Sequence, residues 1–204
     1  MGLKKFLGIL RSMSALIWIT TIIFILSMAA GWFSTGAIQS LLVNQLDQLG
    51  EVAQGLQQSD NAQLSFFVFI FLNNAIKCVL VIFLGAAFGI FPLLFITING
   101  MVIGFLVHMV AASGTVSLYD LIVKGLLPHG IIELPVLVIA CAYGLRFGGM
   151  VWSSITGAIS GERSTRRDWP EFMRETGNMS LWVAILLFIA AIIESTVTYS
   201  LLGG

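Results

Sequence analysis

The residues of this chain best suited to do chemistry are His129 and Glu133, four positions apart in the segment PHGIIELP. On a helix this spacing places both side chains on one face, one turn apart. A histidine exchanges a proton near neutral pH, and a neighbouring carboxylate can share in that exchange. The pair is therefore a candidate site for a ligand, a substrate or a proton.

Further polar side chains interrupt apolar stretches elsewhere: His108, Glu194, Asn73, Asn74, Asn99 and Lys77. Ionisable and amide groups are costly in hydrocarbon, and those found there usually have a function. We expect His108, His129, Glu133 and Glu194 in the outer halves of three spanning helices, where they could converge at one depth. The asparagines lie nearer the midplane and can both donate and accept hydrogen bonds.

Three hypotheses compete for His129 and Glu133. The two side chains can satisfy each other or the backbone freed by Pro135, they can form a ligand site, or they can bind a metal ion. The metal hypothesis is the least favoured, because the second histidine of HExxH is missing. The sequence also lacks GxSxG or another nucleophile beside a base, so we expect no enzyme and no cofactor. A metal-dependent membrane enzyme is the third functional hypothesis, after a scaffold and a transporter.

The composition identifies a membrane protein. The chain is 58% apolar and only 10% charged, whereas soluble domains carry roughly 25% charged residues. Its formal net charge of zero offers no footprint for nucleic acid. We predict an all-α, polytopic bundle in a single domain, residues 1–204, with spans at about 12–33, 64–84, 92–112, 128–152 and 181–201.

Three connecting segments have their own character. Residues 34–63 are rich in Gln and carry leucines at helical spacing, which predicts an external amphipathic helix. Residues 117–127 predict a short re-entrant or interfacial helix, with Ser117 and Asp120 in capping positions. Residues 153–180 hold four arginines and predict a cytoplasmic loop.

The basic residues predict the orientation in the cell membrane. Seven of the ten Lys and Arg lie at the N-terminus or in residues 153–180. Because basic residues favour the cytoplasmic side, both regions are expected there, and the C-terminus is then external.

The members of three glycine pairs within or beside the apolar stretches are four residues apart: Gly85 and Gly89, Gly100 and Gly104, and Gly144 and Gly148. On helices such pairs make smooth faces where another backbone can approach closely. Packing within the chain is the favoured interpretation, and a homodimer seam is the alternative.

The segments FIFLNNAIK, TINGMVIG and GLLPHGIIELPVLVIACAYGLRFG follow the amphipathic segment in this order. In this order they resemble the stage II sporulation protein M family, over residues 64–150 by motif and over the whole chain by span layout. The positions shared with the family are Asn73, Asn74, Asn99, Gly100, Pro128, His129, Gly130, Glu133, Gly144 and Gly148.

The resemblance implies an integral membrane protein that, in sporulating bacteria, serves with cell-wall hydrolases during engulfment as a scaffold. Because relatives also occur in organisms that never form spores, the family name does not establish the role of a member. We therefore expect a non-enzymatic scaffold or anchor of a membrane complex, with envelope remodelling as one setting, working as a homo-oligomer or with other membrane proteins. The alternative is a transporter or channel-like protein for a small polar solute, ion or lipid.

Overall fold

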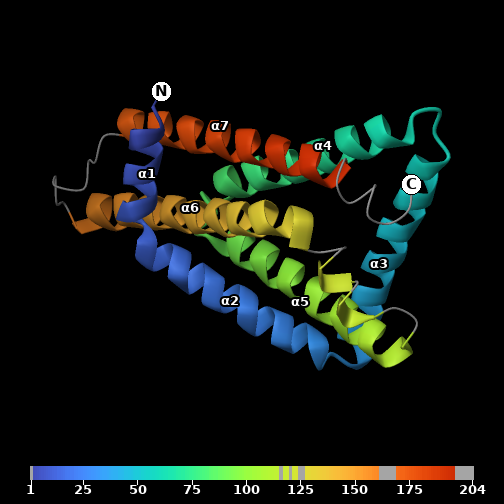
Figure 1. The fold of residues 1–204 in the computed structure, drawn as a ribbon. Coiled ribbons are helices and arrows are strands. Elements are labelled where there is room, and N and C mark those ends of the chain that lie inside the picture. The colour runs from blue at the N-terminus through green and yellow to red at the C-terminus, as the bar shows by residue number, and fades with distance from the viewer. Residues whose placement is uncertain (1, 115–116, 120, 124–126, 161–168, 196–204) are drawn as a thin grey trace.

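The computed structural model describes residues 2–114, 117–119, 121–123, 127–160 and 169–195, and these residues form helices and no strands. The helices are α1 (Leu3–Ser12), α2 (Ser14–Trp32), α3 (Gly36–Gln57), α4 (Ala62–Leu84), α5 (Ile90–Ser113), α6 (Leu127–Ser160) and α7 (Trp169–Ile193). Within the described residues, five helices are long and apolar enough to cross a membrane: α2, α4, α5, α6 and α7. The predicted all-α bundle is confirmed (Figure 1).

Helix α6 is the centre of the bundle. In its most apolar stretch 61% of the residues are buried, against 22–33% in the other four long helices. It packs against α2, α4, α5 and α7. The small residues Ala140, Cys141 and Ala142 have no exposed surface, and such small side chains let neighbouring helices approach closely.

The predicted loop at residues 153–180 was too long. Helix α6 continues to Ser160 and α7 begins at Trp169, so the last span starts 12 residues before the predicted Leu181. Hydropathy marks where charges begin, whereas a helix continues as long as its backbone hydrogen bonds are made. Phe172, which falls within the predicted loop, is buried and stacks on Tyr143 of α6. Residues 196–201 of the predicted last span lie outside the described residues.

A short helix at the N-terminus, α1, was not predicted from the sequence. Its residues Phe6 and Ile9 are buried, and the Phe6 ring stacks on Trp182 of α7 with centroids 5.2 Å apart. Helix α1 lies across the end of the bundle where α6 ends and α7 begins (Figure 1). The helical spacing of Phe6, Ile9 and Met13 was the available signal.

The amphipathic segment forms helix α3 at the opposite end of the bundle, against α4 and α5 (Figure 1). Leu42 is its buried residue, while Ile38 and Leu41 are exposed. In the short segment after α5, the backbone N–H of Tyr119 donates to Ser117 Oγ at 3.2 Å, as an N-terminal cap does. Asp120 and residues 124–126 lie outside the described residues.

All six paired glycines pack within the chain. A Cβ on Gly85 would overlap the backbone of Gly144, and one on Gly148 would overlap the backbone at Phe88 and Gly89. Gly100 and Gly104 contact the backbone of α2 in the same way. Gly85 and Gly89 lie in the turn between α4 and α5 instead of on a helix, and Gly89 has φ +77°, which favours glycine. These close contacts account for the glycine pairs without a second copy of the chain.

Candidate functional site

A cavity of about 790 Å³ lies between α3, α4, α5 and α6. Six of the eight predicted site residues line it: Asn73, Asn74 and Lys77 from α4, Asn99 from α5, Glu133 from α6, and Glu194 directly after α7. Gln45 and Gln48 of α3 add two more amides. Side chains that are far apart in the sequence therefore face one internal space.

The remaining wall is apolar. Its larger side chains come from α4 and α5 and include Phe66, Phe69, Ile98, Val102 and Leu106. Helix α3 contributes Leu46, Leu49 and Val52. A few converging polar groups in a largely apolar cavity are typical of a binding site for a small molecule.

The amides of the cavity are held by local hydrogen bonds. Asn73 Nδ2 donates to Asn74 Oδ1 at 3.3 Å. Asn99 Nδ2 donates to the backbone oxygen of Phe95, one turn earlier on α5, at 2.8 Å.

The charged groups of the cavity are near one another, but Lys77 forms no ion pair with a described carboxylate. Lys77 and Glu133 are close enough for their charges to interact, and so are Glu133 and Glu194. Yet no carboxylate of the described residues lies within 4.0 Å of the Lys77 ammonium. A cation that faces a cavity in this way can bind an anionic group of a ligand. In a structural ion pair, by contrast, the cation is already bound to a carboxylate of the protein.

His108 does not line this cavity, so the structure does not bring it together with Glu133 and Glu194, with which the sequence suggested that it could converge. Its ring packs edge-on against Trp32 at the end of α2, with centroids 5.1 Å apart. His108 follows Gly100 and Gly104 at intervals of four, and that face of α5 is pressed against α2. Residues Asn99, Val102 and Leu106 lie on the face that lines the cavity. The spacing of His108 from Gly100 and Gly104 could have shown that it lies on the face of α5 that packs against α2 and not on the face that lines the cavity.

The side chain of His129 lies outside what the structure describes, although the backbone there belongs to α6. Its neighbour Gly130 lines the cavity. Among the described residues, no three His, Cys, Asp or Glu side chains gather closely enough to hold a metal ion. The pairing of His129 with Glu133, and a metal on that pair, stay predictions.

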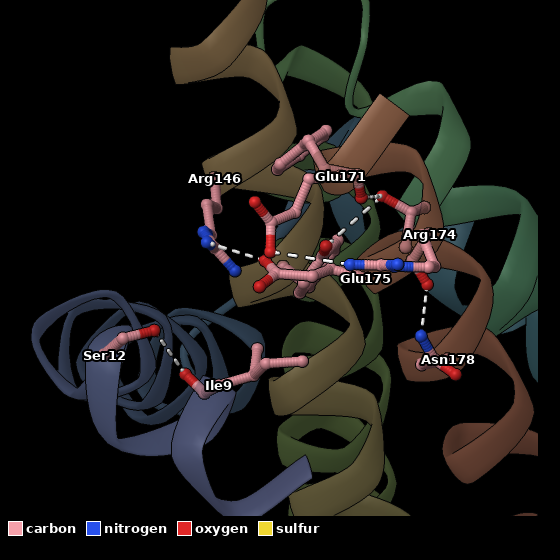
Figure 2. A network of polar contacts seen from close by, with 10 residues as sticks. Ile9, Ser12, Arg146, Glu171, Arg174, Glu175 and Asn178 are labelled. Atoms are coloured by element: carbon pink, nitrogen blue, oxygen red, sulfur yellow. Dashed lines mark hydrogen bonds and ion pairs between the residues drawn. The ribbon is translucent and has the colours of Figure 1, made fainter. Parts of the chain in front are cut away.

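A second polar cluster, which was not predicted from the sequence, lies at the other end of the bundle. Arg146 Nη2 donates to Glu175 Oε2 at 3.1 Å (Figure 2). The guanidinium also lies over the rings of Tyr143 and Phe172, at 5.4 and 5.6 Å from their centroids. The Tyr143 hydroxyl is 3.2 Å from Thr176 Oγ1. Because residues 169–180 were expected to be a loop, Glu175 could not be placed opposite Arg146.

Comparisons with known proteins agree with this architecture. The model of the family described as Stage II sporulation protein M matches residues 20–199. An uncharacterized protein of Methanocaldococcus jannaschii is 27% identical over 138 residues, which cover 68% of this chain and 58% of the relative. The matched region thus spans little more than half of that relative. No solved structure matches the chain.

Proposed function

This chain belongs to the stage II sporulation protein M family of membrane proteins, and on that premise we propose that it is a non-enzymatic protein that carries a small polar solute, ion or lipid through its intramembrane cavity. One observation carries the proposal: six predicted polar residues from α4, α5, α6 and the end of α7 line a single cavity. Carriers hold their substrates between membrane-spanning helices, and this cavity lies between α4, α5 and α6, with α3 at its side.

The test uses the full chain in proteoliposomes with three probes: sodium ion, inorganic phosphate and a fluorescent phosphatidylethanolamine. We expect at least one probe to cross, and Glu133→Gln to abolish its movement while the protein still folds. Glu171→Gln is the matched control, because Glu171 is exposed and lies on α7 away from the cavity lining. Movement of none of the probes, or equal rates in the wild type and Glu133→Gln, would overturn the proposal.

A scaffold is the second candidate, and the exposed apolar side chains of α3 favour it. Ile38 and Leu41 are 48% and 65% exposed, so α3 offers apolar surface to another membrane protein or to a second copy of the chain. Replacing both by serine is expected to remove cross-linked complexes from membranes. Complexes that survive this change, and survive deletion of residues 34–63, would count against a scaffold.

We also propose that the end of the bundle carrying α1 is cytoplasmic. Lys4, Lys5 and Arg11 lie on α1, which lies beside the end of α6 and the start of α7 (Figure 1). The arginine-rich residues 161–168 join α6 to α7 in the sequence. Helix α3, which lacks Lys and Arg, then lies outside, as does the C-terminus. In intact cells, a membrane-impermeant maleimide should label Asp47→Cys and spare Lys4→Cys. The native Cys78 and Cys141 are buried and give little background.

A further inference from the structure

Resting on the carrier function proposed above, we propose that the ligand of the cavity is a zwitterionic phospholipid, whose headgroup holds a phosphate and an ammonium. The polar lining, the spacing of its charges and the apolar wall each support this chemistry.

The polar lining contains groups for both signs of charge. Lys77 lies one turn from Asn73 and Asn74 on α4, and an ammonium with neighbouring amide donors suits a phosphate. Glu133 and Glu194 suit an ammonium. A purely anionic ligand would meet two carboxylates, and a purely cationic one would meet Lys77. A headgroup with both charges satisfies both sides.

Lys77 and Glu133 lie at different distances along their helices from the contact between α4 and α6. Helices α4 and α6 run in the same direction and touch where Gly85 meets Gly144 (Figure 1). Lys77 precedes Gly85 by eight residues, about 12 Å of helix, and Glu133 precedes Gly144 by eleven, about 17 Å. An axial offset of about 5 Å suits a phosphate and an ammonium joined by a two-carbon linker. The phosphate then lies at Lys77 and the ammonium nearer to Glu133.

The apolar wall favours a lipid over the free headgroup. Phe66, Phe69 and Leu106 line the cavity together with further apolar residues of α4 and α5. A soluble zwitterion such as phosphoethanolamine would leave this surface in contact with water. Acyl chains would cover it, and burying apolar surface is favourable at roughly 25 cal/mol per Å².

The experiment titrates the delipidated full chain, by native mass spectrometry, with phosphatidylethanolamine, phosphatidylglycerol, a cationic trimethylammonium lipid and soluble phosphoethanolamine. We expect phosphatidylethanolamine to bind at least tenfold more tightly than the other three. Lys77→Gln should shift the preference toward the cationic lipid, and Glu133→Gln toward phosphatidylglycerol. Arg174→Gln, an exposed position at the other end of the bundle, should change nothing.

Each contrary outcome has a separate meaning. Equal binding of the three lipids, or unchanged preferences in both charge variants, would overturn the zwitterion. Equal affinity for phosphoethanolamine would overturn the lipid. If either variant fails to fold, Ala53→Trp fills the cavity from α3 and should abolish binding by steric exclusion. Sodium or phosphate transport that depends on Glu133, without lipid selectivity, would leave the carrier function standing and remove this inference alone.

Discussion

At the end of the bundle near α1, Arg146 and Glu175 meet at 3.1 Å, and the guanidinium lies over the rings of Tyr143 and Phe172. In the cavity below α3, Lys77, Glu133 and Glu194 surround a space of about 790 Å³ instead. Both clusters place charge on helices that are long and apolar enough to cross a membrane. In the first cluster the two charges pair with each other, although Arg146 Nη1 is buried without a hydrogen-bond partner among the described residues. In the second, no carboxylate of the described residues lies within 4.0 Å of the Lys77 ammonium.

This comparison distinguishes charges that stabilise the fold, such as Arg146 and Glu175, from a charge that is available to a ligand, such as Lys77. Removing one partner of a buried ion pair leaves the other charge unpaired, and this penalty makes such pairs costly to break. Lys77, which faces the cavity, has no carboxylate partner within 4.0 Å among the described residues. The comparison therefore predicts large losses of stability at the first cluster and losses of function at the second.

The largest effect on stability is expected from Arg146→Ala. The substitution leaves Glu175, which is 19% exposed, without its partner and removes the guanidinium from two aromatic rings. We expect a loss of about 2–3 kcal/mol in the free energy of unfolding, below the roughly 3–5 kcal/mol of a fully buried pair. Lys77→Ala should cost no more than about 0.5 kcal/mol. Equal losses in denaturant unfolding of the two purified variants would remove the distinction.

A somewhat smaller loss is expected from Gly144→Ala, which tests the packing between the two clusters. The added Cβ would lie 2.5 Å from Pro92 Cγ and 2.8 Å from the backbone oxygen of Val81. Overpacking of this kind costs about 1–3 kcal/mol. The control is Gly149→Ala, where nothing lies within 4 Å of the new atom. If both variants melt at the same temperature in detergent, the close contact of α4 with α6 is contradicted.

The smallest effect is expected from Arg174→Ala, in the ion pair with Glu171 on the surface of α7. The two side chains are 65% and 56% exposed and meet at 3.6 Å. Exposed pairs of this kind contribute about 0.2–1 kcal/mol, and salt screens them. We expect the melting temperature to fall by little, and by less still in high salt. A loss as large as that of Arg146→Ala would mean that burial does not distinguish the two pairs.

Much of the fold could be predicted, because a membrane imposes its length on an apolar helix. The first four spans begin within two residues of their predicted starts. The start of α7 was misplaced by 12 residues, since charged residues such as Glu175 were assigned to a loop. Their helix is stabilised by aromatic contacts with α6, which no local pattern reveals.

The candidate site was predicted in part. Six of eight residues line the cavity, but His108 faces α2. The outcome for His108 depended on the rotation of α5, which is set by the approach of Gly100 and Gly104 to α2. A prediction from depth in the membrane places residues at the same level of the bundle. The rotation of each helix about its own axis then decides which of these residues meet.

The sequence by itself determined that this chain is a bundle of membrane-spanning helices with a few costly polar residues inside, because hydrocarbon admits only backbones that satisfy their own hydrogen bonds. It also determined which residue types were available for a site. The tertiary structure decided which charges are paired with each other and which face a cavity. That choice follows from helix rotation and close glycine contacts, and these are properties of pairs of helices instead of single segments.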